Sequence, residues 1–233
     1  MPAAFNLLLV LCLLLEIFHH PFVTALEVRG NVVTLYNATD VIEFSNEVNN
    51  RNSYDGSTVL LGEDIDFSGL SDKFSPIGTV DDILFRGVFD GQGHTISNLV
   101  VNSTGRFIGF FGAINGTSFK NVVVDSSCSV LSTYNFTESF GSVGGIIGCA
   151  LPDVEDPNSK IENCVNMASV TLAGVPGIEN KTRRFTASAG GIVGYFVYYN
   201  TSSVIRNCVN YGELRQAGLC DFGSVGGVLG SFF

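Results

Sequence analysis

Near-identical glycine-rich segments recur along this chain, and internal repetition at this length scale restricts the fold more than any single motif does. SVGGIIG at 142–148, SAGGIVG at 188–194 and SVGGVLG at 224–230 are near copies, which we call the glycine boxes. KIENCVNMASV at 160–170 and VIRNCVNYGEL at 204–214 are a second set of copies, which we call the asparagine boxes. The two motifs alternate, so a single unit is repeated along the chain.

Looser copies extend the repetition toward the N-terminus. FIGFFGAINGTSFKNVVVDSS at 107–127 has GFFG where the later units have a glycine box and FKNVVV where they have an asparagine box. FRGVFDG followed by HTISNLVV, within 85–101, is looser still. The repeated unit therefore accounts for most of the chain after about its first third.

Each unit alternates short β-rich runs with Gly, Asn, Asp and Ser turns, and no run is long enough for an independent helix. Such a unit buries its apolar side only when it is stacked on copies of itself, which predicts a parallel β-solenoid. Gly before an Ile, Val or Leu pair fits a tight corner, and Asn at one register fits turns whose side-chain amides hydrogen-bond along the stack. The spacing leaves room for protruding loops at 150–159 and 174–185.

The two ends of the predicted stack differ. TDVIEFSNEVNN, from Thr39, has near-helical apolar spacing, and Asp40 with Glu43 reads as a capping box, so we expect a short helix that covers the first coil. The last unit stops within a repeat at GGVLGSFF. We therefore expect either a chain that is incomplete at its C-terminus or an end coil that pairs with something else.

These motifs resemble those of GLUG-motif proteins, which form right-handed parallel β-helices. STVLLGEDIDFSG, FSPIGT, FRGVFDGQGHTISNLVV and FIGFFGAINGTSFKNVVV are similar to their first coils, and SVGGIIG…IENCVN and SAGGIVG…IRNCVN to the GLUG repeats themselves. The resemblance covers roughly residues 40–233. It implies a large secreted or surface-attached protein, often linked to adhesion, although members of the family usually carry more repeats and an anchor or further domains.

The first 25 residues are predicted to be a signal peptide, which leaves residues 26–233 as the β-helix. FNLLLVLCLLLEIF, from Phe5 to Phe18, is an apolar run shorter than a membrane span, and Val23 and Ala25 supply small residues at a cleavage site. No Lys or Arg precedes the run and Glu16 lies inside it, so an uncleaved signal anchor is the alternative. No second long apolar segment follows that would span a membrane in the mature chain.

Six N-x-S/T sequons support secretion independently, since they all follow the proposed cleavage site. They predict a glycosylated protein, secreted or at the cell surface. The asparagines are Asn37, Asn102, Asn115, Asn135, Asn180 and Asn200.

The charge pattern argues against polyanionic partners. The formal net charge is −10 and no run of Lys or Arg is present, so neither nucleic acid nor an anionic membrane surface is expected to bind.

Catalysis on this scaffold would need carboxylates that converge from adjacent coils, as in polysaccharide lyases and glycosidases, or a Ca²⁺ held by carboxylates beside a Lys or Arg. Asp64 and Asp66 alternate with Ile65, so both face one side of a strand. The remaining acids lie in turns, and no nucleophile motif accompanies them. The candidate acids are Glu63, Asp64, Asp66, Asp81, Asp82 and Asp90.

DGQG at 90–93 reads as a scaffold corner rather than an active-site loop, with Phe85, Val88 or Phe89, and Ile96 as its buried side chains. His94 is the one histidine that remains after signal removal, and a single His cannot build a zinc site. We therefore expect neither a catalytic histidine nor a bound cofactor or metal.

Five cysteines follow the signal, and an odd number leaves at least one without a partner in the chain. Cys164 and Cys208 occupy the same position of the repeat, at a spacing that suits a disulfide if one repeat is one coil. A ladder of buried free thiols is the alternative.

Taken together, the sequence favours a secreted or surface-associated adhesive solenoid that binds glycans or cell-surface proteins without catalysis. End-to-end self-association is an additional expectation. A polysaccharide-cleaving enzyme is the alternative, and the convergence of Asp or Glu side chains from neighbouring coils would distinguish it.

Overall fold

The fold consists mostly of β-strands arranged in parallel sheets, as expected for an all-β protein. The predicted signal peptide, Asp81 and Cys220 lie outside the described residues, as do most of the two predicted loops. The computed structural model describes residues 26–70, 74–79, 82–116, 118–134, 140–151, 159–173, 186–197, 203–217 and 222–232.

Four successive sets of five strands make up the repeated region. Set 1 consists of β5 (Val88–Asp90), β6 (Thr95–Ser97), β7 (Val100–Ser103), β8 (Phe107–Ile108) and β9 (Phe111–Asn115), and set 2 of β10 (Ser118–Lys120), β11 (Val123–Val124), β12 (Ser129–Ser132), β13 (Gly141–Gly144) and β14 (Ile147–Leu151). Set 3 consists of β15 (Lys160–Glu162), β16 (Val165–Asn166), β17 (Ser169–Ala173), β18 (Thr186–Gly190) and β19 (Val193–Phe196), and set 4 of β20 (Val204–Arg206), β21 (Val209–Asn210), β22 (Leu214–Ala217), β23 (Phe222–Gly226) and β24 (Leu229–Phe232).

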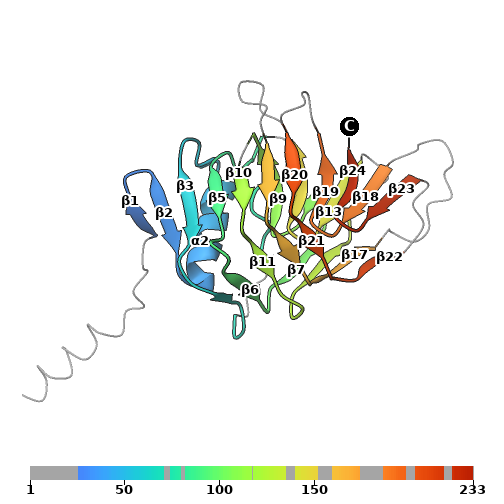
Figure 1. The fold of residues 1–233 in the computed structure, drawn as a ribbon, viewed down its shortest axis with the longest axis horizontal. Helices are drawn as coiled ribbons and strands as arrows, with labels where there is room; N and C mark the ends of the chain where they lie inside the picture. Colours follow the sequence, from blue (N-terminus) through green and yellow to red (C-terminus); the bar gives the residue numbers. More distant parts are fainter. Residues whose placement is uncertain are drawn as a thin grey trace, which may run out of the picture.

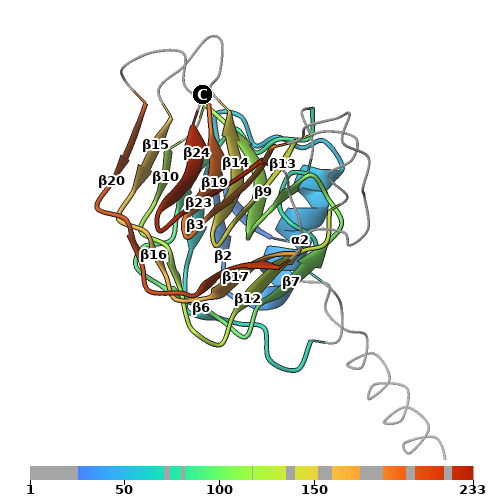
Figure 2. The same ribbon diagram turned by 90° about the vertical axis from the view of Figure 1, so that its right-hand side faces the viewer.

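Each strand pairs in parallel with its counterpart in the next set, so the sheets run along the stack while the chain runs across it (Figures 1 and 2). The pairing is in register with the repeats: Val165 of one asparagine box faces Val209 of the other, and Ser142, Ser188 and Ser224 of the three glycine boxes align. The repeats of the sequence are therefore the layers of the structure.

The N-terminal region closes one end of the stack. It contains β1 (Glu27–Arg29), β2 (Val32–Leu35), α2 (Ala38–Asn49), β3 (Thr58–Leu61) and β4 (Ile65–Asp66). β2 and β3 extend the sheet of β5 in parallel, whereas β1 pairs with β2 in the antiparallel direction and forms the sheet edge. Charged side chains on such an edge disfavour further pairing, and β1 carries Glu27 and Arg29.

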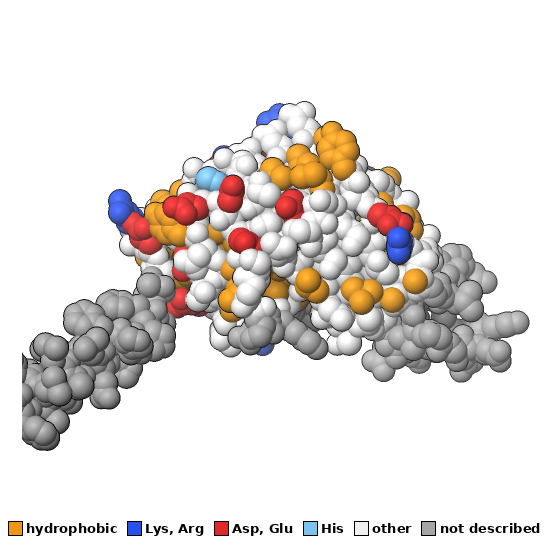
Figure 3. All heavy atoms as spheres, turned by 90° about the horizontal axis from the view of Figure 1, so that it is seen from below, with side chains coloured by type: hydrophobic (Ala, Val, Ile, Leu, Met, Phe, Trp, Pro, Cys, Tyr) orange, Lys and Arg blue, Asp and Glu red, His pale blue; other side chains and the backbone are white. Residues whose placement is uncertain are grey.

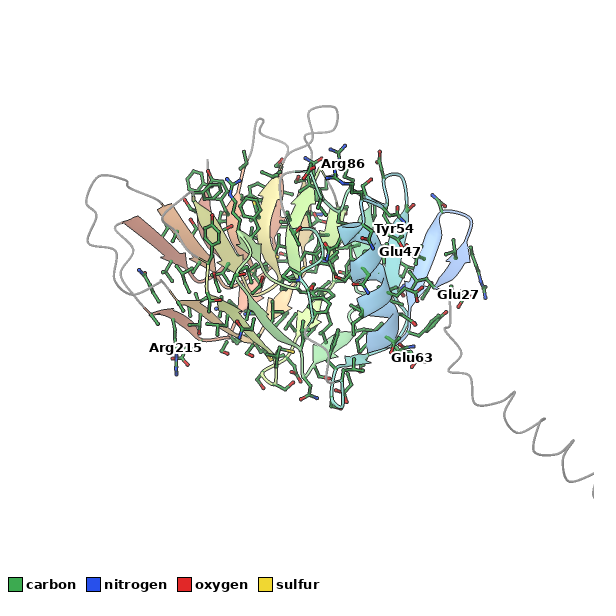
Figure 4. The ribbon with its side chains drawn as sticks, turned by 180° about the vertical axis from the view of Figure 1, so that it is seen from behind. Glu27, Glu47, Tyr54, Glu63, Arg86 and Arg215 are labelled. Carbon is green, nitrogen blue, oxygen red and sulfur yellow. The ribbon has the colours of Figure 1, made fainter. Side chains whose placement is uncertain are left out.

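The predicted helix exists as α2, but the prediction of Asp40 as its N-cap was wrong. Asn37 has extended backbone angles and its side chain accepts a hydrogen bond from the backbone N–H of Asp40, so Asn37 is the cap. Asp40 lies inside the first turn, where its carboxylate accepts from the N–H of Tyr36. At the other end, Glu47 accepts a hydrogen bond from the hydroxyl of Tyr54, which ties the last turn to the next loop (Figure 4).

Phenylalanines fill the N-terminal half of the core, where α2 packs against the first strand sets. Phe44 of the helix contacts the rings of Phe85, Phe89 and Phe111, with centroids 5.6–6.3 Å apart. These residues are fully buried, as is Ile96, which confirms the inward positions expected around the DGQG corner. Edge-to-face packing, as Phe44 makes with Phe85 and Phe111, adds to the free energy of apolar burial.

The two repeated motifs contact each other in the core. A Cβ on Gly145 of the first glycine box would overlap the side chain of Asn166 in the following asparagine box, and one on Gly191 would overlap that of Asn210. Glycine at these positions leaves room for an asparagine side chain from the next set. The Asn166 side chain donates to the Oδ1 of Asn210 (2.9 Å), so the amide stacking that the sequence predicted is confirmed.

Candidate functional site

The outer face of the sheet β4–β6–β11–β16–β21 carries the candidate acids Asp64 and Asp66, and we call this face the lateral flank. Residues on it alternate with buried ones along each strand, so Asp66, Asp125 and Met167 point outward while Ile65 and Val124 point into the core. Figure 3 shows carboxylates and a histidine gathered on this side of the molecule.

Asp64 and His94 form one pair on the flank. The Oδ1 of Asp64 lies 3.2 Å from the Nδ1 of His94 and accepts the backbone N–H of Thr95 at 2.8 Å. These two hydrogen bonds, from Thr95 first and His94 second, lower the pKa of Asp64. His94 therefore helps to join β6 to the segment before β4.

Asp66 forms a second, separate group. Its Oδ1 accepts from the side-chain amide of Asn98 (2.8 Å), and both its oxygens accept from Ser68. The bond from Asn98 makes the largest contribution to lowering the pKa of Asp66. As predicted, Asp64 and Asp66 face the same side of the strand, but each binds its own partners.

Asp90 lies at the corner between β5 and β6 and is partly buried. Burial opposes its ionisation, but hydrogen bonds from Asn121, from the backbone of Gln92 and from Lys120 outweigh that effect and lower its pKa. The Nζ of Lys120 is 3.2 Å from Oδ2 of Asp90. Gln92 and Gly93 both have positive φ, as a scaffold corner requires.

The other acids do not join these groups. Asp82 forms an exposed ion pair with Arg51 at 2.8 Å, and Glu63 is exposed. Within the described residues, no three His, Cys, Asp or Glu side chains are close enough together to hold a metal ion. Asp64, Asp66, Asp82 and Asp90 thus each bind a residue about 30 positions away in the chain.

The flank becomes apolar toward set 4. Val209 is 39% exposed and Tyr211 is 75% exposed, and both continue the rows that begin with Asp64 and Asp66. The lateral flank therefore grades from fixed carboxylates at one end to an exposed aromatic ring at the other.

A second cluster, not anticipated from the sequence, lies over β8 and β19. The guanidinium of Arg106 is 4.7 Å from the ring centroids of both Phe107 and Phe140, and its Nε donates to the carbonyl of Phe140 (2.9 Å). Phe140 also packs on Tyr195, with centroids 4.6 Å apart, and burial raises the pKa of Tyr195. Phe140 and Tyr195 are far in sequence from the adjacent pair Arg106 and Phe107, so only the arrangement of the sets reveals the cluster.

Cys164 and Cys208 lie side by side in adjacent sets as free thiols. The hydrogen bond between them lowers the pKa of Cys208 to about 7 and, together with burial, raises the pKa of Cys164. Cys128 and Cys149 are buried elsewhere. The disulfide therefore stays a prediction, and the structure places its two residues as neighbours.

The predicted glycosylation sites fall into three groups. Asn37 and Asn102 are exposed. Asn115 in β9 is only 9% exposed, which disfavours a glycan there in the folded chain. Asn135, Asn180 and Asn200 lie outside the described residues.

No protein-family model and no curated protein matches this sequence. The fold is similar to that in the crystal structure of a putative immunoglobulin A1 protease from Bacteroides ovatus, with a TM-score of 0.57 and 23% sequence identity over 86% of this chain. This chain corresponds to 62% of the length of that one. At this identity the likeness shows the shared fold alone. Among the described residues, no helix is long and apolar enough to cross a membrane.

Proposed function

We propose that this protein is a secreted or surface-associated adhesive protein that binds glycans through its lateral flank, without catalysis. Its scaffold would be a right-handed parallel β-helix of GLUG-like repeats, with each strand set as one coil. The in-register parallel pairing of four consecutive sets supports this architecture, and right-handed connections are the rule between parallel strands.

The observation that carries the proposal is the composition of the flank. Tyr211 is 75% exposed, and carboxylates held in fixed orientations lie on the same sheet. An exposed tyrosine offers a sugar ring an apolar surface with a polar edge, and fixed carboxylates accept hydrogen bonds from hydroxyl groups. Hydrogen bonds to neighbours fix the orientation of these carboxylates. A carboxylate can accept about four hydrogen bonds, so each one keeps lone pairs for a ligand.

The test is binding of the secreted protein to an array of glycans. Tyr211→Ala is expected to weaken binding at least tenfold, a loss of about 1.4 kcal/mol. Tyr36→Ala is the matched control, because Tyr36 is also exposed, at 40%, but directly follows β2, which belongs to a different sheet. Binding that responds equally to both substitutions, or to neither, would exclude the lateral flank as the glycan site.

A polysaccharide-cleaving enzyme is the alternative, and its test is separate. Asp64, Asp66 and Asp90 bind three different sets of partners, whereas glycosidases need two carboxylates acting on one bond. Incubation with acidic polysaccharides should release no reducing ends above a heat-denatured sample. Release that Asp66→Asn abolished would replace the adhesive proposal with an enzymatic one.

A further inference from the structure

Two kinds of outward-facing side chain recur along the lateral flank, once in each strand set. The first kind is an asparagine in the turn that leads into a flank strand, and these residues are Asn121, Asn163 and Asn207. The second kind is a β-branched residue of the strand itself, and these residues are Thr95, Val123, Val165 and Val209. Because the strands pair in register, each kind forms a column that repeats about every 4.8 Å along the stack.

The amide column is held in place but keeps donors for a ligand. Asn121 donates to the Oδ1 of Asp90 (2.8 Å), and Asn163 donates to the Oδ1 of Asn121 (3.0 Å). A side-chain amide has two N–H groups, and no described residue accepts the second one from Asn121 or from Asn163. Asn163 is exposed and Asn121 is partly exposed. The column therefore offers one oriented donor in each of these sets.

The β-branched column places an apolar surface beside these donors. Val123 and Val165 each lie two residues after an asparagine of the amide column. Both valines are partly exposed, whereas the residues on either side of each valine are buried, so the valines point away from the core. A pyranose ring has the same division of polarity, because its hydroxyl groups surround faces made of C–H groups. Sets 2 and 3 thus repeat one arrangement that suits one sugar ring.

The charges around the columns disfavour an anionic glycan. No Lys or Arg occurs in the five strands of the flank or in the turn that leads into each of them. Lys120 and Arg206, which precede two of these turns, are paired with Asp90 and Glu162 at 3.2 and 2.5 Å. Figure 3 shows Lys and Arg side chains only toward the margins of this face. The carboxylates of the flank would therefore repel a uronic acid, a sialic acid or a sulfate group.

We propose that the ligand is an uncharged, extended glycan that runs along the stack with one sugar unit in each strand set. This inference rests on the proposed function, since it names the class of glycan and its direction on the same flank. Each unit would lay one face on the β-branched residue and accept a hydrogen bond from the neighbouring amide. Strands about 4.8 Å apart match the length of one unit in an extended β-1,4-linked chain, so sugars and sets stay in step.

Chain length tests this arrangement. The probes are β-1,4-linked oligosaccharides of glucose, mannose or N-acetylglucosamine, two to six units long, and the measurement is calorimetric titration of the secreted protein. In at least one series the Kd should fall at least tenfold between two and four units, because each added unit contacts a further set. The α-1,4-linked glucose tetramer, whose chain coils, should bind at least tenfold more weakly than the tetramer of that series.

Three results would overturn the proposal: full affinity at two units, equal binding of the coiled tetramer, or no binding of any β-1,4-linked series. If the glycan array still shows binding that depends on Tyr211, each of these results leaves the proposed function standing. An array without any bound glycan would remove the proposed function as well, so the two failures are distinguishable.

Oxidation of the ligand tests the charge preference. The tetramer that binds best, with its C6 hydroxymethyl groups converted to carboxylates, should bind at least tenfold more weakly at low salt. The difference should shrink as salt is added, because salt screens repulsion between exposed charges. Equal or tighter binding of the oxidised tetramer would contradict an uncharged ligand.

A matched pair of variants within set 3 locates the contact. Val165→Asp removes the apolar surface on the flank and should weaken binding of the tetramer at least tenfold. Thr171→Asp is the control, because Thr171 is also partly exposed and lies on β17, in the neighbouring sheet. Circular dichroism establishes that both variants keep the parent fold. Equal weakening by both substitutions, or by neither, would place the glycan away from the β-branched column and overturn the proposal.

Discussion

Asn163 donates a hydrogen bond from its side-chain amide to the side-chain oxygen of Asn121, 3.0 Å away and 42 residues earlier in the chain. Both residues have positive φ, at 55° and 57°. Asparagine tolerates this left-handed backbone better than other side chains do, and here the same side chain also links successive sets. One residue type therefore serves both the turn and the column, which explains why Asn recurs at this position.

Replacement of Asn163 separates these two roles. Asn163→Ala should lower the free energy of unfolding by about 2–4 kcal/mol. The variant loses the side-chain hydrogen bonds to Asn121 and from Asn207, and it places alanine in the left-handed backbone region, which alanine disfavours. Asn163→Gly keeps the backbone favourable and should cost about 1–2 kcal/mol. Urea unfolding monitored by circular dichroism measures both.

Asn207→Ala is the control for this comparison, since Asn207 has the same backbone angle but bonds on one side only. It should destabilise less than Asn163→Ala. Equal losses for the alanine and glycine variants at 163 would mean that the turn conformation contributes nothing measurable.

The glycine boxes offer a second matched pair. Gly191→Ala should destabilise the fold by at least about 2 kcal/mol, because its Cβ would overlap both the Asn210 side chain and the backbone of Gly227. Gly227→Ala places the same methyl in open space and should change the free energy of unfolding by less than about 0.5 kcal/mol. Similar losses for the two variants would show that the closeness of Gly191 to Asn210 does not limit stability.

The repeated layers were predictable from the sequence because the motifs that define them are the contacts between layers. The asparagine boxes form the amide columns, and the glycine boxes form the corners that receive the Asn side chains. The helix was also predictable, but its start was not: Asn37 and Asp40 are both good N-cap residues, and only the backbone angles distinguish them.

The functional surfaces were less predictable. Burial of Asn115 depends on its place at the end of β9, which a sequon does not encode. The cluster of Arg106 with Phe107 and Phe140 joins residues that share no register in the repeat. The alternation around Ile65 correctly placed Asp64 and Asp66 on one side, but their separate partners come from the next strand set.

Glycan occupancy should follow the exposure of the asparagines. Peptide mapping of the secreted protein should find glycans at Asn37 and Asn102 and none at Asn115, because the glycosylated amide must lie at the surface. At Asn37 the Oδ1 accepts from the N–H of Asp40, so a glycan on the Nδ2 is compatible with the helix cap. Loss of one glycan mass in Asn37→Gln and Asn102→Gln, but not in Asn115→Gln, is the expected pattern. A glycan at Asn115 would mean that this site is modified before β9 folds.

In the reduced protein, Cys208 should react with iodoacetamide over an unusually low pH range. Its pKa is lowered to about 7 by the hydrogen bond from Cys164, so the alkylation rate should reach half its maximum near pH 7. Cys164→Ala removes that donor and should move the midpoint upward, toward the ordinary range of a thiol. A midpoint unchanged by Cys164→Ala would show that the neighbouring thiol does not stabilise the thiolate.

The same pair should make stability depend on pH in two opposite steps. Between about pH 7 and 9 the folded Cys208 is ionised while the unfolded thiol still holds its proton, so the free energy of unfolding rises with pH. Above about pH 9 both unfolded thiols ionise, but Cys164 keeps its proton in the fold, so the free energy falls again. Urea unfolding of the reduced protein across this range should show that maximum, and the Cys164→Ala, Cys208→Ala double variant should lose it.

Oxidation of this pair should lock the last two sets together. Residues paired in register on adjacent parallel strands have Cα atoms about 5 Å apart, within the range of a disulfide. A bond between positions 44 residues apart would stabilise the fold by roughly 4 kcal/mol in the chain-entropy model. Non-reducing peptide mapping of the secreted protein should recover residues 164 and 208 in one linked peptide, and reductant should lower the melting temperature of the parent but not of Cys208→Ser. Recovery of both thiols free from the secreted protein would instead favour the ladder of buried thiols.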